Sequence, residues 1–160
     1  MKKILFILLG IILFVSCTDT KEEPEVMSEV NKEQLLYLVN LYRAAGCNCG
    51  QYGDFPPVDP LVWNDTLQLA AWDHSRDMNK KNFFDHIGSD GSNPGTRMTK
   101  RGYIWKAAGE NIAKGTFTDN VLIHGWISSA GHCVNIMDPN FKEMGISQVG
   151  NYWTQVFGAR

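Results

Sequence analysis

The chain has 160 residues, of which 44% are hydrophobic, and it carries 15 Lys and Arg against 17 Asp and Glu. That length suits one globular domain with a hydrophobic core and excludes two. The slightly acidic balance offers no basic tract for a phosphate backbone, so nucleic acid is excluded as the expected partner.

Residues 1–16 have the features of a processing signal. Two lysines precede an apolar run that is too short to span a bilayer. The run ends at Phe14-Val-Ser-Cys17, which resembles the lipobox of bacterial lipoproteins. We therefore predict a signal peptide over 1–16 and a lipidated Cys17; the alternative is an uncleaved anchor helix. The first reading predicts an exported lipoprotein anchored to the outer membrane, with display on the cell surface as a further location.

Residues 17–30 predict an acidic, flexible tether. The segment holds five Asp and Glu residues, one proline and almost no bulky apolar side chain. Such a segment cannot bury enough surface to offset the entropy of ordering it. Without residues 1–16 the chain keeps 13 basic against 17 acidic residues. The predicted domain covers the remaining residues, 31–160.

Three helices are predicted in the first two thirds of the domain. Apolar residues recur there at three- and four-residue spacing, and Asn, Asp or Pro stands at the expected starts. The predicted helices cover residues 31–45, about 65–79, and 96–101.

The last third predicts two helices and a hairpin. A helix capped by Thr118 or Asp119 has an inward face of Val121, Leu122 and Trp126. We expect Ser128 to Gly131 to interrupt it, before a short helix that carries His132 and ends ahead of Pro139. Strand-like runs follow at 144–149 and 152–157, joined by a Gly-Asn turn. Together these elements predict an α+β fold or a three-layer sandwich.

An exported chain is free to form disulfides. With Cys17 lipidated, three cysteines remain, which allows one bridge and one free thiol. We favour Cys49 with Cys133, with Cys47 with Cys133 as a close alternative. A Cys47–Cys49 bridge is strained, and Cys-x-Cys is not the usual spacing of a zinc knuckle.

The four histidines fall into two pairs. His74 and His124 lie on or beside apolar helix faces, so we expect them to be core residues. His86 and His132 adjoin turns rich in glycine and serine, where side chains tend to face a cleft.

Glu110 stands in a stretch of small and apolar residues. A buried carboxylate there requires a histidine or a cation as partner. Two histidines and one carboxylate can hold zinc, or they can form a hydrogen-bond network that fixes loops. The sequence contains no His-Glu-x-x-His helix, no Gly-x-Ser-x-Gly elbow and no phosphate-binding loop, so it predicts no established catalytic motif.

Eight motifs, taken in order, resemble the superfamily of cysteine-rich secretory proteins, antigen 5 and pathogenesis-related 1, known as CAP or SCP domains. The resemblance covers about Glu33 to Gly158. Its pieces are Leu38-Val-Asn-Leu-Tyr-Arg43, Pro60-Leu-Val-Trp-Asn64, Leu69-Ala-Ala-Trp-Asp-His-Ser75, Phe84-Asp-His86, Gly109-Glu-Asn-Ile-Ala113, Trp126-Ile-Ser-Ser-Ala-Gly-His132 with Asn135-Ile136, Met144-Gly-Ile146, and Tyr152-Trp-Thr-Gln-Val-Phe157.

The resemblance implies a three-layer α-β-α sandwich around a central antiparallel sheet. It also implies a cleft lined by two histidines and acidic residues, which fall on His86, Glu110 and His132. The second acid of many eukaryotic members falls near Ser129, where this chain has no carboxylate; Ser129 is therefore the fourth candidate cleft residue. The three remaining residues are the candidate zinc ligands.

Three functions are compatible with these residues, because a fold alone does not fix a function. The first is a lipid-anchored binding or interaction module, whose cleft takes a small apolar ligand, a glycan, a peptide or a protein. The second is a zinc-dependent hydrolase or protease that uses the same cleft. The third is a structural network beside an idle cleft.

Overall fold

The computed structural model describes residue 27 and residues 29–160. The predicted signal peptide, Cys17 and most of the predicted tether lie outside these residues. Within the described part, no helix combines the length and the apolar character needed to cross a membrane.

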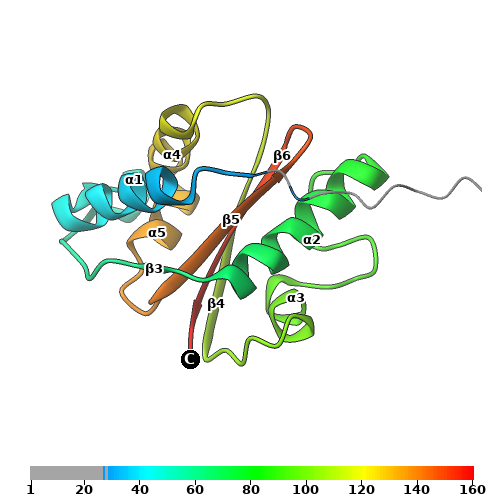
Figure 1. Ribbon diagram of the computed structural model, residues 1–160. Coiled ribbons are helices and arrows are strands. Elements are labelled where there is room, and N and C mark those ends of the chain that lie inside the picture. The colour runs from blue at the N-terminus through cyan, green and yellow to red at the C-terminus, as the bar shows by residue number, and fades with distance from the viewer. Residues whose placement is uncertain (1–26, 28) are drawn as a thin grey trace, which may run out of the picture.

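The domain has three layers (Figure 1). On one side of the sheet lie α1 (Lys32–Ala45), α4 (Asp119–Ser128) and α5 (Ala130–Met137), and on the other lie α2 (Asp65–Lys81) and α3 (Pro94–Lys100). Between them run β3 (Val62–Trp63), β4 (Ala107–Lys114), β5 (Glu143–Val149) and β6 (Tyr152–Ala159). The predicted α-β-α sandwich is confirmed.

The sheet has the strand order β3-β5-β6-β4. The predicted hairpin of β5 and β6 closes where Val149 pairs with Tyr152. β4 pairs antiparallel with the whole of β6. The short edge strand β3 runs parallel to β5, so the sheet is antiparallel except at this edge. A second, two-stranded sheet of β1 (Cys47–Asn48) and β2 (Asp54–Phe55) encloses the short 3₁₀ helix η1 (Gly50–Tyr52).

The structure corrects three predictions in the last third of the chain. β4 was not predicted, because its buried residues Glu110, Asn111 and Ile112 are consecutive and show no alternation. Only Ser129 separates α4 from α5, since α5 begins at Ala130. Val121 is 56% exposed, and Ile123 faces the core in its place.

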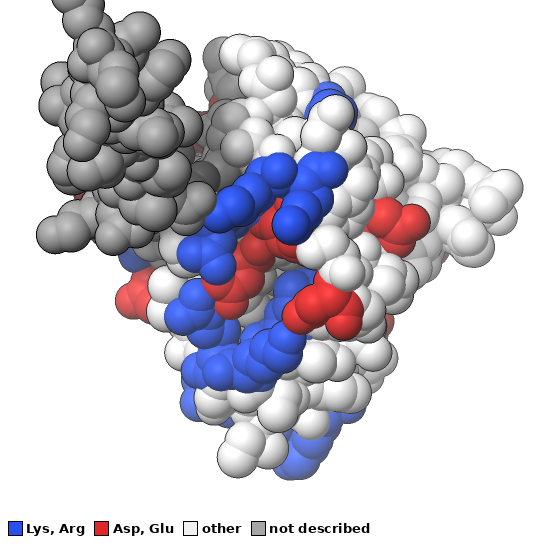
Figure 2. All heavy atoms as spheres, turned by 90° about the vertical axis from the view of Figure 1, so that its right-hand side faces the viewer, with Lys and Arg blue, Asp and Glu red and all other residues white. Residues whose placement is uncertain are grey.

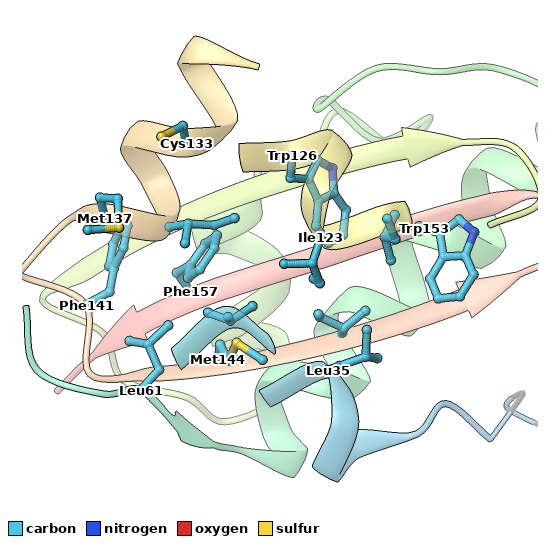
Figure 3. Close-up of a cluster of buried hydrophobic side chains, with 14 of the residues drawn as sticks. Leu35, Leu61, Ile123, Trp126, Cys133, Met137, Phe141, Met144, Trp153 and Phe157 are labelled. Carbon is cyan, nitrogen blue, oxygen red and sulfur yellow. The ribbon is translucent and has the colours of Figure 1, made fainter. Parts of the chain in front are cut away.

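The main hydrophobic core lies between the sheet and the layer of α1, α4 and α5 (Figure 3). Trp126 and Ile123 from α4 pack there with Phe157 from β6. Val30 joins the same cluster, so packing begins at the last residue of the predicted tether. Each fully buried side chain of this size contributes about 1.5–3 kcal/mol.

Arg43, fully buried on α1, fixes the end of α5. Its guanidinium donates hydrogen bonds to the carbonyl oxygens of Ile136 (2.7 Å), Asp138 (3.0 Å) and Asp59 (2.7 Å). Burial lowers the pKa of Arg43, and the nearby carboxylates of Asp138 and Asp59 oppose that shift. The carbonyls of Ile136 and Asp138 at the end of α5 are thus satisfied by a side chain from another helix, which sets the position of α5 against α1.

β5 and α2 approach each other closely at Gly145. A Cβ atom added there would overlap the backbone of Gln68 on α2. Only glycine therefore allows this helix to lie directly on this strand.

We expect Gly145→Ala to destabilise the domain by about 1–3 kcal/mol, because α2 would have to move off the sheet. Urea unfolding followed by circular dichroism measures this change. The matched control is Gly131→Ala on α5, where an added Cβ meets no atom within 4 Å; it should leave the stability unchanged or raise it by up to about 1 kcal/mol, because alanine is the better helix former. Equal stability of the two variants would contradict the close packing of α2 on β5.

Candidate functional site

The candidate site is built around Glu110, whose side chain is only 1% exposed on β4. Its Oε2 accepts a hydrogen bond from Nη2 of Arg97 at 2.6 Å, and its Oε1 accepts one from Nδ1 of His86 at 2.8 Å. Both carboxylate oxygens are therefore engaged by groups that carry or can carry positive charge. The buried carboxylate was predicted to need a histidine or a cation as partner, and it has both: His86 is the histidine and Arg97 is the cation.

Arg97 on α3 is the cation, and sequence reasoning did not single it out. It is buried, and it also donates to the carbonyl oxygens of Ser92 (2.8 Å) and His86 (3.0 Å). It thereby holds the loop before α3 against β4. Nothing in the local pattern separates Arg97 from Lys100 or Arg101, the other basic residues at the end of α3.

His86 is half-exposed, and its hydrogen bond to Glu110 raises its pKa above the usual value. Because the pKa of His86 is higher in the folded protein than in the unfolded chain, the contact of protonated His86 with Glu110 stabilises the fold. The whole of this stabilisation is present when the pH is below the ordinary histidine pKa. The contribution is lost as the pH rises through the raised value.

His74 lies behind this pair and is fully buried, as expected for a core histidine. Its Nε2 donates to the carbonyl oxygen of Asp85 at 2.8 Å. Burial lowers its pKa, although Glu110 acts in the opposite direction. The 3.7 Å between His74 Nε2 and Glu110 Oε1 is too long for a hydrogen bond, so we treat His74 as a neutral residue beside the carboxylate.

His124 was expected in the core, but it is exposed on α4. The inward face of α4 is formed by Leu122, Ile123 and Trp126, and His124 falls outside that stripe.

His132 stands in the first turn of α5, which an amide network ties to β4. Asn111 donates to the carbonyl oxygen of His132 (3.3 Å) and to Oε1 of Gln155 (3.1 Å). Asn135 donates to the carbonyl oxygen of Glu110 (3.0 Å) and to Oδ1 of Asn111 (2.9 Å). These two asparagines belong to the motifs quoted above, and the structure gives them a positioning role.

Burial lowers the pKa of His132, and the nearby His86 lowers it further. A protonated His86 therefore disfavours protonation of His132, and the pKa values of the two histidines shift in opposite directions. His86 has a carboxylate partner, whereas the shift of His132 comes first from desolvation.

A small pocket of about 190 Å³ opens beside His132. Its walls are mainly apolar, and Ser129 and His132 are its polar residues. The lining consists of Ile112, Ala113, Phe117, Val121, Leu122, Gly125, Trp126, Ser129 and His132. Of the four candidate cleft residues, the structure thus joins Glu110 to His86 directly and places Ser129 with His132 at this pocket.

The residues as arranged do not fit the three-ligand zinc site. Within the described residues, only Cys47, Cys49 and Cys133 form a set of three ligating side chains whose donor atoms lie within 4.8 Å of one another. His86, Glu110 and His132 do not meet that limit, and both oxygens of Glu110 already serve Arg97 and His86.

The opposite face of Arg97 borders a charged hollow of about 300 Å³ between α2 and α3. Figure 2 looks onto this side of the molecule, where Lys and Arg interleave with Asp and Glu. Lys100 pairs with Asp90 at 2.7 Å, and Arg101 pairs with both oxygens of Asp73. Because these charges compensate one another, the hollow differs in character from the apolar pocket beside His132.

We expect Glu110→Gln to destabilise the domain by about 3–5 kcal/mol, because it leaves Arg97 buried without a counter-charge. It should also return the pKa of His86 toward its ordinary value, which NMR titration of the imidazole measures. Glu33→Gln, at an exposed position on α1, is the control and should change neither quantity appreciably. An unchanged His86 pKa in Glu110→Gln would contradict the assigned hydrogen bond.

Comparison with known proteins gives relatives in sequence and in structure. The chain is 42% identical over 102 residues to the uncharacterised protein YkwD of Bacillus subtilis, an alignment that covers 62% of this chain and 40% of that protein. A crystal structure of an extracellular SCP-domain protein from Bacillus anthracis superposes with a TM-score of 0.68 and 27% identity, over 80% of this chain and 40% of that one.

An outer surface protein of Borrelia burgdorferi shares the fold, with a TM-score of 0.62 at 16% identity, over 84% of this chain and 99% of that one. The chain spans only 40% of the length of its Bacillus subtilis relative. The sequence model of the cysteine-rich secretory protein family matches residues 36–157. Since that match covers most of the chain and the three-layer fold agrees with it, this protein belongs to the cysteine-rich secretory protein (CAP) family.

Proposed function

We propose that this protein is a binding module of the cell envelope, anchored by a lipid on Cys17, whose pocket beside His132 takes a small apolar group. The observation that carries the proposal is the pocket itself: apolar walls with Ser129 and His132 as the polar residues. Ligand sites commonly combine an apolar lining with a few placed polar groups.

The polar residues of the pocket favour an uncharged ligand end. Burial lowers the pKa of His132, which favours the neutral imidazole. A neutral imidazole and the Ser129 hydroxyl can each donate or accept one hydrogen bond. A hydroxyl or amide on an apolar body suits such a site better than a carboxylate or a phosphate.

The pocket rests on a fixed frame, which supports binding without large rearrangement. Asn111 and Asn135 hold α5 to β4, and Arg43 holds its far end to α1. The disulfide of Cys49 and Cys133 adds a covalent tie to the loop after α1. A preorganised site spends less binding energy on ordering.

Location in the envelope rests on the lipobox-like Phe14-Val-Ser-Cys17 and on the relatives. The Bacillus anthracis neighbour is described as extracellular, and the Borrelia burgdorferi neighbour as an outer surface protein. An exported location for this chain is consistent with both.

We expect phenol, an apolar ring with one hydroxyl, to shift the backbone amide NMR signals of Ser129 and His132. Val121→Asp places a charge at the pocket wall and should weaken this binding at least about tenfold, because an apolar ligand cannot compensate a desolvated carboxylate. Val62→Asp is the matched control: Val62 is 61% exposed against 56% for Val121, and it lies on β3.

N-acetylglucosamine and a short apolar peptide serve as the comparison ligands. Shifts from the peptide at the same amides would identify its apolar side chains as the natural occupants. If only N-acetylglucosamine shifted the amide signals of Ser129 and His132, or if none of the three compounds did, the proposal that the pocket binds an apolar group would be overturned.

We expect the full chain to incorporate radiolabelled palmitate when it is expressed in a host that lipidates proteins, and Cys17→Ala to lose the label, because Cys17 is the predicted site of acylation. Acyl chains contribute about 0.8 kcal/mol per buried CH₂ to membrane binding. Cys47→Ala is the control and should keep the label. Label retained by Cys17→Ala would contradict the lipid anchor without bearing on the pocket.

A further inference from the structure

Three sulfur atoms meet where the loop after α1 touches α5. Cys49 and Cys133 form the disulfide, and Cys47 is a free thiol. Sγ of Cys47 lies 3.3 Å from Sγ of Cys133 and 3.9 Å from Sγ of Cys49. The free thiol is thus already in contact with the bridge, and its nearer neighbour is Cys133.

We propose that these cysteines form a thiol–disulfide exchange site in which Cys133 alternates between Cys49 and Cys47 as partners. The distances of Cys47 Sγ to the two bridged sulfurs are similar, so the thiol lies beside the Cys49–Cys133 bond and its side chain must first rotate into line with that bond. The Cys47 thiolate then attacks Sγ of Cys133 and forms a new bond as the Cys49–Cys133 bond breaks. The electron pair of the broken bond goes to Cys49, which leaves as a thiolate and takes up the proton that Cys47 lost. No oxidant or reductant is needed, because one disulfide and one thiol are present before and after the step.

Cys133 is the sulfur that changes partners for a geometric reason. Attack on Cys49 would join Cys47 to Cys49, and a bridge across a single intervening residue is strained. Attack on Cys133 keeps a long-range bridge between the same two segments. Both products tie the loop after α1 to α5, so the domain keeps its covalent tie throughout.

Burial keeps the exchange slow near neutral pH, since it raises the pKa of Cys47 and the thiolate is the attacking species. The charged or titratable side chains on the surrounding elements include Tyr42 and Arg43 at the end of α1, Tyr52 on η1, Asp54 on β2 and His132 on α5. Asp54 is hydrogen-bonded to Asn48, and Arg43 is engaged by backbone carbonyls. Desolvation is the cause of the raised Cys47 pKa.

The exchange would reach the pocket through η1. Cys49 caps η1, and a Cβ on Gly50 would stand 3.4 Å from the Cβ of Ala130, so η1 lies against the start of α5. His132 directly precedes Cys133 in α5. Release of Cys49 frees η1 from α5, whereas the bridged form holds it against the turn that carries His132 and Ser129.

The test uses the full chain with Cys17→Ala, so that Cys17 does not compete, purified without reductant. It is incubated natively at pH 8.5 with limiting N-ethylmaleimide, then digested at acidic pH, and tandem mass spectrometry identifies the alkylated cysteine. We expect the label on Cys47 in one population and on Cys49 in another, the latter at a tenth of the total or more. Each labelled population should carry the complementary bridge to Cys133.

Two variants keep the outcome decisive. Cys47→Ser should leave Cys49 unlabelled, because no internal thiol remains to displace it. Cys49→Ser should form the Cys47–Cys133 bridge and retain the circular dichroism spectrum of the folded domain. Label confined to Cys47 at all times, Cys49 labelled equally in Cys47→Ser, or a Cys49→Ser variant with two free thiols would each overturn the proposal.

Discussion

The arrangement of the site depends on the hydrogen bonds and ion pairs that the buried Glu110 carboxylate makes with Arg97 and His86. A charge removed from water is tolerated only with partners of opposite charge and satisfied hydrogen bonds, and Glu110 draws those partners from two different segments. Arg97 comes from α3, and His86 comes from the loop before it. The backbone carbonyl of the same residue accepts from Asn135 on α5. One residue of β4 therefore couples the helices on both faces of the sheet.

The two histidines of the candidate site, His86 and His132, have pKa values that shift in opposite directions. His86 is stabilised in its charged form by Glu110, while His132 is disfavoured in its charged form by burial and by His86. The candidate site therefore has an exposed ionic part at His86 and a neutral part at His132 beside the apolar pocket. In the binding mode proposed above, a ligand with its apolar body in the pocket would meet hydrogen-bonding groups and no fixed charge.

Sequence reasoning found the elements whose signals are local. The helices and the β5–β6 hairpin follow from periodicity, caps and a Gly-Asn turn, and the resemblance to the family identified His86, Glu110 and His132. What it missed depends on contacts distant along the chain: Arg97 bonded to Glu110, Arg43 bonded to the end of α5, and β4, whose consecutive buried polar residues conceal the strand pattern. The partner of Cys133 stayed open for a related reason, since Cys47 and Cys49 are two residues apart and both lie beside it.

The place of β6 in the sheet constrains how the domain is made. β6 is the last of the four strands along the chain, yet it lies between β5 and β4 and pairs with both along their length. A nascent chain that has not yet delivered residues 152–159 lacks the central strand that both helix layers cover. The non-local pairing of β4 with β6 then closes in a late, cooperative step, as is typical of folds rich in long-range contacts. During synthesis the β4 segment therefore has no strand to pair with until β6, which begins almost forty residues further along the chain, has been made.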